Sequence, residues 1–191
     1  MACKTSSIAK QREKVVPFAE GRVLEIGIGS GLNLPFYNAE KVTRVWGVEP
    51  SAEMRTKAQK EAEKANFEVE LLNCPGEEIP LENNSADTVL MTFTLCTIPN
   101  ALQALKEMRR ILKPEGRLIF CEHGLAPDEN VARWQHRITP VWKKFAGGCH
   151  LNRAIPELIT QGGFRIQQME TMYIPTWKPA GFNYWGMAEE A

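Results

Sequence analysis

The sequence lacks an excess of charge of either sign, and it lacks a long apolar run. Lysine plus arginine number 23, as do aspartate plus glutamate. A chain without a basic or acidic surplus is not expected to need nucleic acid or an anionic membrane surface as a partner. No segment approaches the roughly 20 apolar residues that span a bilayer, and the opening MACKTSSIAKQREKVV contains no signal-peptide core. We therefore expect a cytoplasmic protein with a small-molecule partner and no integral membrane contact.

Cysteine is scarce and irregularly spaced. The five cysteines form no CxxC pair. An odd number without such spacing argues against both a disulfide framework and a structural zinc site. The sequence therefore predicts free thiols and no metal site, and it contains no signal for oligomeric state.

The apolar residues that are present indicate one α/β domain over residues 1–191. A chain of 191 residues, 43% of them apolar, can build one substantial core. Five short apolar runs alternate with helix-like or loop segments, which predicts a parallel sheet; they cover residues 23–28, 42–48, 67–72, 88–94 and 117–122. Helices are expected over 52–65, 101–112 and 154–161. The tail predicts two further strands, over 164–173 and 182–188, as a hairpin at the sheet edge.

The segment VLEIGIGSGLNL combines an apolar strand with a glycine loop. Gly27, Gly29 and Gly31 allow positive φ angles and bring the backbone close to a ligand, and we expect a helix to begin after them. Leu32 stands where a dinucleotide-binding fingerprint requires its third glycine, which disfavours a nicotinamide cofactor. Glu25 could attract an ammonium group. A ligand with both an ammonium and a carboxylate is an amino acid, and the methionine end of S-adenosylmethionine fits this description.

Glu49 ends the second apolar run, in VWGVEP, where its carboxylate could accept hydrogen bonds from ribose hydroxyls. The chain resembles the class I S-adenosylmethionine-dependent methyltransferases in the order of its motifs. These are ExGxGxG, a strand that ends in an acid, PGEEIPLENNSADTV and LKEMRRILKPEGRLIF. The resemblance implies a Rossmann-like seven-stranded sheet with helices on both faces and an antiparallel last strand. Pro75 stands where this family commonly has the Asp that binds adenine, so Gly76 and Glu77 are the candidates there. The expected cofactor-binding residues are Glu25, Gly27, Gly29, Gly31, Asn33, Glu49, Pro50, Gly76, Glu77, Thr92, Phe93 and Leu95.

The motifs LCT, EHG and GCHLNR together resemble a narrower group, the alkyl-thiol S-methyltransferases of the soluble bacterial type. This resemblance implies methyl transfer to a small thiol or sulfide. N- or O-methylation of a small metabolite or phospholipid headgroup is the alternative within the enzyme class, and a non-catalytic cofactor-binding protein is the alternative outside it. His123 is expected to act as the base, Glu122 to orient it or hold the cap, and Arg153 to supply positive charge. The alternatives are a histidine that is only hydrogen-bonded within the cap interface and an arginine in a structural ion pair.

Residues 125–162 are expected to form a small helical cap over the reactive methyl group. The stretch 131–149 is rich in aromatic and basic residues and follows the fifth strand, where a parallel sheet presents its binding edge. Trp134 and Trp142 are expected to face inward. Cys149 is not expected to act as a nucleophile, because displacement on the cofactor needs no covalent enzyme intermediate.

Overall fold

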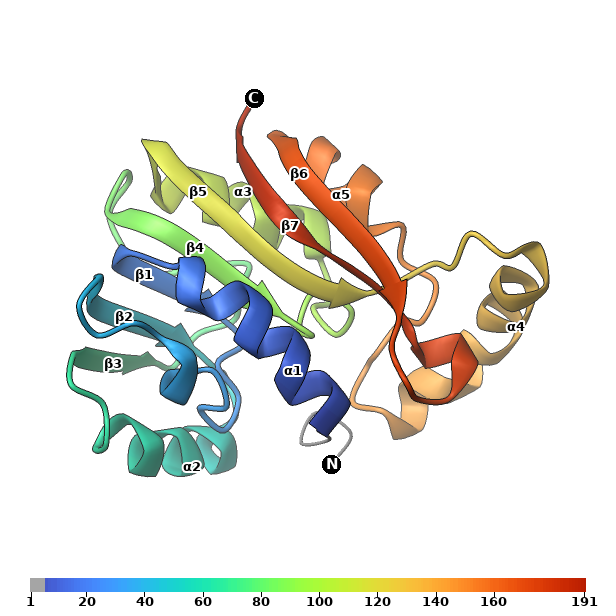
Figure 1. The fold of residues 1–191 in the computed structure, drawn as a ribbon, viewed down its shortest axis with the longest axis horizontal. Helices are drawn as coiled ribbons and strands as arrows, with labels where there is room; N and C mark the ends of the chain where they lie inside the picture. The colour runs from blue at the N-terminus through green and yellow to red at the C-terminus, as the bar shows by residue number, and fades with distance from the viewer. Residues whose placement is uncertain (1–5) are drawn as a thin grey trace.

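A seven-stranded sheet runs through residues 6–191, the part of the chain that this computed structural model describes (Figure 1). The spatial order is β3-β2-β1-β4-β5-β7-β6. The first five strands pair in parallel, and β7 pairs antiparallel with both β5 and β6. The predicted sheet, its antiparallel last strand and the terminal hairpin are therefore confirmed. The strands are β1 (Gly21–Ile26), β2 (Val42–Val48), β3 (Glu68–Leu72), β4 (Ala86–Thr92), β5 (Leu112–His123), β6 (Phe164–Tyr173) and β7 (Phe182–Glu190).

Alternating side chains of the central strands give the sheet two apolar faces. In β4, Val89 and Met91 pack in the core that holds α3 (Ala101–Ile111) and α5 (Ile155–Gln161). Leu90 packs in the core on the other face, together with Val15 of α1 (Ser6–Val15). The side chains of a strand point alternately to its two faces, so one apolar run supplies both cores. The expectation of helices on both faces is confirmed.

The connection between β1 and β2 differs from the expectation. No α-helix follows the glycine loop there; the chain forms only a 3₁₀ turn, η3 (Leu34–Phe36), before β2 begins. The turn ends at Tyr37, whose backbone is extended (φ −67°, ψ 139°), and few residues remain before Val42 for a full helix. The N-terminal α1 lies in front of the central strands instead (Figure 1), followed by the 3₁₀ turn η2 (Val16–Phe18). Cys3 lies outside the described residues.

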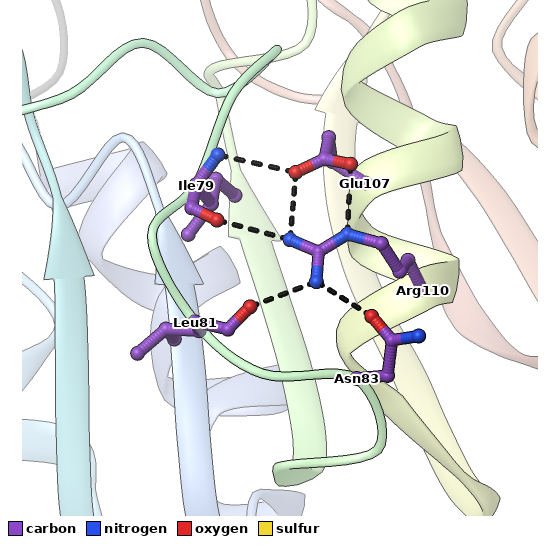
Figure 2. A network of polar contacts seen from close by, with 5 residues as sticks. All are labelled: Ile79, Leu81, Asn83, Glu107 and Arg110. Atoms are coloured by element: carbon purple, nitrogen blue, oxygen red, sulfur yellow. Dashed lines mark hydrogen bonds and ion pairs between the residues drawn. The ribbon is translucent and has the colours of Figure 1, made fainter.

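One arginine of α3 forms hydrogen bonds to the loop between β3 and β4. Arg110 donates hydrogen bonds to the carbonyl oxygens of Ile79 (2.9 Å) and Leu81 (2.7 Å) and to Oδ1 of Asn83 (2.8 Å), as Figure 2 shows. Glu107 pairs with the same guanidinium at 2.8 Å and accepts the N–H of Ile79 at 3.1 Å. This network holds the segment that carries Gly76 and Glu77. The helix α2 (Ala52–Ala62) forms the crossover before β3.

The helix α4 (Glu129–Phe145) forms the predicted helical insertion and lies beyond the carboxyl end of β5, at one end of the molecule (Figure 1). Its buried Gln135 accepts the N–H of Ala126 and donates to the carbonyl oxygens of Gly124 and Pro179, each at 2.9 Å. The last of these contacts is to η4 (Lys178–Ala180), so one side chain ties the insertion to two loops. None of the helices in the described part of the chain has the length and apolar character that crossing a membrane requires.

Candidate functional site

The glycine loop has the backbone conformation that its residue type allows. Gly27, Gly29 and Gly31 have φ angles of +66°, +57° and +80°, a region that side chains with a Cβ rarely adopt. A Cβ on Gly27 would lie 2.0 Å from Oγ1 of Thr94. The loop at the end of β1 can therefore approach the end of β4 only because this position has no side chain.

A cavity of about 650 Å³ opens at this edge of the sheet. Its walls include five of the predicted cofactor residues, namely Gly27, Glu49, Pro50, Gly76 and Glu77. The volume lies within the range of small-ligand and cofactor sites. Glu49 accepts the N–H of Ser51 with Oε1 at 2.8 Å. The position at the carboxyl ends of parallel strands is where α/β sheets bind their ligands.

A second group of predicted residues forms a buried polar network beside the glycine loop. Glu25 accepts hydrogen bonds from Nδ2 of Asn33 (2.8 Å) and from the hydroxyl of Tyr37 (2.7 Å). The guanidinium of Arg12 donates to Oδ1 of Asn33 and to Oγ1 of Thr92, both at 2.7 Å. Burial raises the pKa of Glu25 to about 7, against the opposing effects of Tyr37, Arg12 and Asn33.

Two members of this network, Arg12 and Tyr37, were missed by the sequence analysis. Arg12 comes from α1, whose inward residues are partly polar, and it contacts Asn33 in the connection after β1 and Thr92 at the end of β4. The sequence shows no motif around either residue. Arg12 also lines a cavity of about 530 Å³ on the other side of the loop, together with Gly31.

The remaining predicted wall residues follow β4, and their side chains lie in different surroundings. Phe93 has a φ of +53° and is half-buried, with the guanidinium of Arg12 5.5 Å from its ring centre. Leu95 is fully buried among core residues of the α3 face, so its side chain packs in the core and does not line the cavity.

Glu122 holds the end of β4. Its Oε1 accepts the N–H groups of Thr94 (2.9 Å) and Leu95 (3.0 Å), and the side chain is fully buried. Burial raises its pKa to about 7. The structure shows no hydrogen bond from Glu122 to His123: Oε1 accepts these two backbone N–H groups, and both Oε2 of Glu122 and Nδ1 of His123 are buried without a hydrogen-bond partner among the described residues.

Arg153 lies beside the same loop. Its guanidinium donates to the carbonyl oxygens of Leu95 and Ile98, the latter at 2.7 Å. Burial lowers its pKa, while Cys96 first and then Glu122 act against this shift. The positive charge expected from Arg153 is therefore present near this loop, held by backbone carbonyls.

Three donor side chains from separate parts of the chain meet at the loop after β4, and we call them the thiol–imidazole cluster: Cys96, His123 and Cys149. Thr94 and Thr97 of the same loop line the cavity. Nε2 of His123 lies 3.3 Å from Sγ of Cys149, and all three donor atoms lie within 4.8 Å of one another. Hydrogen bonding from Cys96, followed by that from His123, lowers the pKa of Cys149 to about 4, against the effect of burial. No short spacing links these cysteines in the sequence, so their proximity was not predicted.

The two tryptophans of α4 differ in their surroundings and exposure. Trp142 stacks against Trp177 with ring centres 5.3 Å apart, and its Nε1 contributes to the lowered pKa of Cys149. Trp134 is 59% exposed and lies on the outer face of α4. The expectation that both face inward is wrong for Trp134, because Gln135, the next residue, occupies the inward-facing position on the helix.

The sheet order, the antiparallel β7 and the glycine loop with an acid at the end of β2 are those of class I methyltransferases. A family model described as a methyltransferase domain matches residues 24–120, half of the chain, and the chain belongs to this family. It is an S-adenosylmethionine-dependent methyltransferase, and S-adenosylmethionine is its cofactor.

Two curated relatives and one solved structure extend the comparison. The rat thiol S-methyltransferase TMT1B is 34% identical over 173 residues, which cover 88% of this chain and 70% of the relative. The human TMT1B is 34% identical over 178 residues, covering 89% and 72%. A methyltransferase from Thermotoga maritima, described as a possible histamine N-methyltransferase, aligns with a TM-score of 0.67 at 23% identity, over 96% of this chain and 89% of that one. The last comparison supports the fold alone.

Proposed function

We propose that the chain transfers the methyl group of S-adenosylmethionine to a small thiol or sulfide. One observation carries this proposal: the motifs LCT, EHG and GCHLNR meet in the thiol–imidazole cluster. Thr97 of the first motif also lines the cofactor cavity. The two TMT1B relatives, which are named thiol S-methyltransferases, support it.

The chemistry of a thiol acceptor matches this environment. Methyl transfer from a sulfonium is an in-line displacement, so the protein has to align the nucleophile and exclude water. A half-buried site raises the pKa of a bound thiol, whereas the thiolate is the reactive form. A positive group must counter this effect, and Arg153 lies next to the cluster. His123 remains our candidate base, and its contact with Cys149 means that it acts together with the two cysteines.

For the cofactor we propose that Glu25, Gly27 and Gly29 bind the methionine end and Glu49 binds the ribose. The buried network gives Glu25 a fixed position from which to attract an ammonium group. Gly76 and Glu77 lie on the cavity wall, where a backbone N–H or a carboxylate could contact adenine in place of the Asp that the family commonly has.

The test is an assay of the purified chain with methyl-labelled cofactor and matched panels of alkyl thiols, amines and phenols. We expect labelled methyl thioethers, identified by mass spectrometry, and little product from the other panels. Glu49→Ala serves as a control, because its product should fall at low cofactor concentration and recover at high concentration. Labelled amines or phenols without labelled thiols would overturn the acceptor class.

A cytoplasmic location is part of the proposal. In the described part of the chain, Cys74, Cys121 and Cys149 are thiols outside any disulfide bond. Thiols persist in reducing compartments and are oxidised outside them. Cell fractionation should recover the chain with the cytosolic proteins.

A further inference from the structure

The donor atoms of the thiol–imidazole cluster are spaced like the ligands of one metal ion. Zinc forms Zn–S bonds of about 2.3 Å and Zn–N bonds of about 2.05 Å. With tetrahedral angles, a sulfur and a nitrogen ligand therefore lie about 3.6 Å apart, and two sulfur ligands lie about 3.8 Å apart. Nε2 of His123 and Sγ of Cys149 are 3.3 Å apart, and no pair in the cluster exceeds 4.8 Å. Small side-chain adjustments would therefore bring all three atoms onto one ion.

The backbone holds these donors together without the help of an ion. His150 donates its N–H to the carbonyl oxygen of Cys96 at 2.9 Å, which fixes the segment after α4 against the loop after β4. Arg153 bonds to two carbonyl oxygens of the same loop. His123 is the last residue of β5. Three ligands on fixed elements form a preorganised site.

We propose that Cys96, His123 and Cys149 bind a zinc ion whose fourth coordination position takes up the acceptor thiol. Catalytic zinc sites commonly have three protein ligands and one open position, and two cysteines with one histidine are a known set. A dication bound by two thiolates and a neutral imidazole has no net charge, so the site can be half-buried without an uncompensated charge.

The location of the cluster suits this role, which rests on the proposed thiol acceptor. Thr94, Thr97 and Gly147 line the cofactor cavity. Cys96 lies in sequence between the two threonines, and Cys149 follows Gly147 by two residues. An acceptor held by the ion would therefore lie at the edge of the cavity that binds the cofactor.

In this inference the ion takes the place of His123 as the group that ionises the acceptor, because a ring nitrogen bound to zinc cannot also accept a proton. A thiol that coordinates a zinc ion loses its proton, here to solvent. Its sulfur then forms a bond to the methyl carbon while the bond from that carbon to the sulfonium sulfur breaks, and the electron pair of the broken bond stays on the cofactor. The product is a neutral thioether, which is a weaker ligand than a thiolate and can leave.

The test uses cobalt(II) as a spectroscopic substitute for zinc in the full chain. The protein is reduced, stripped with a chelator and titrated with cobalt(II) without oxygen. We expect one ion per chain, with thiolate-to-cobalt charge-transfer bands and the visible bands of tetrahedral cobalt. Zinc should displace it. Cys96→Ser, Cys149→Ser and His123→Ala should each weaken binding more than about 100-fold, because even outer-shell changes cost 10- to 100-fold.

Two matched variants and a fold check control this experiment. Cys74→Ser and His136→Ala remove a thiol and an imidazole outside the cluster, and both should keep the wild-type spectrum. Circular dichroism of each variant separates loss of a ligand from loss of the fold. A reduced chain that takes up no cobalt overturns the site, whether or not Cys96 and Cys149 then oxidise to a disulfide.

Adding an alkyl monothiol to the cobalt form tests the fourth position separately. We expect a new charge-transfer contribution before any cofactor is added. A cobalt spectrum that the thiol leaves unchanged overturns the proposed role of the ion. If a chain that binds no metal methylates thiols, this inference is overturned and the proposed function stands. If the chain binds cobalt but methylates only amines, the proposed function is overturned and the metal site stands.

Discussion

Glu25 is a single carboxyl group whose protonation the fold changes. In the unfolded chain its pKa is about 4.5, whereas burial raises it to about 7 in the native state. Arg12 from α1, Tyr37 and Asn33 from the loop, and Thr92 from β4 surround the group or its partners. Because folding raises this pKa, the carboxyl group stabilises the folded chain when it is protonated. This contribution to the free energy of unfolding is complete below the pKa of the unfolded chain and is lost as the pH rises through about 7. The difference corresponds to about 3 kcal/mol.

We therefore expect the free energy of unfolding without cofactor to fall more steeply between pH 5 and pH 8 in the wild type than in Glu25→Gln. The glutamine is neutral at every pH, so subtracting its curve removes the contributions of all other groups. Urea unfolding at a series of pH values gives both curves. Parallel curves would show that Glu25 stays ionised in the folded chain.

Glu49 is the residue at which the cofactor assignment can be tested most directly. Its carboxylate lies on the cavity wall at the end of β2. Replacing it with alanine removes hydrogen bonds to a charged group, each worth about 1.5 to 3 kcal/mol. Calorimetry should show the affinity for S-adenosylmethionine lowered tenfold or more. Glu115→Ala, an exposed glutamate near the start of β5, should bind like the wild type; equal binding by both variants would refute the ribose role.

At the scale of elements, Arg110 determines how firmly the loop after β3 is held. Its guanidinium satisfies two backbone carbonyls and pairs with Glu107 (Figure 2). Arg110→Ala should lower the free energy of unfolding by about 2 kcal/mol, since several hydrogen bonds are lost but water replaces them in part. The same loop carries Gly76 and Glu77, so the KM for the cofactor should rise more than kcat falls. Arg109→Ala is the neighbouring control; the same change in KM there would assign the effect to the helix as a whole.

The sequence indicated most elements because their signals are local. The helix predicted over 101–112 is observed as Ala101–Ile111, and each of the five predicted strands overlaps an observed one. Periodicity identifies such segments when one face is consistently apolar. The helix α1 escaped detection because Gln11 and Arg12 are among its buried residues. The helix expected after the glycine loop was inferred from the loop alone, and only a 3₁₀ turn forms there.

At the scale of the whole molecule, the site depends on contacts that no local pattern encodes. The glycine loop and Glu49 were predictable, because each lies within a short motif at a strand end. His123 and Cys149 are 26 residues apart, and only the return of the chain after α4 brings them together. The outward position of Trp134 likewise depends on how Gln135 anchors α4 to distant loops. These features follow from tertiary packing, which sequence spacing does not report.

The last prediction concerns the stability of the whole domain. A ligand that binds only the native state stabilises it by about 2.7 kcal/mol at a concentration 100 times its Kd. For a domain of this size each kcal/mol raises Tm by about 2 to 4 °C, so S-adenosylmethionine at that concentration should raise Tm by roughly 5 to 11 °C. Glu49→Ala at the same concentration should show a clearly smaller increase, whereas Cys149→Ser should match the wild type, because the thiol–imidazole cluster lies outside the proposed cofactor contacts. Differential scanning calorimetry measures all three proteins, and an equal increase in Tm for wild type and Glu49→Ala would place the ribose on other residues of the cavity.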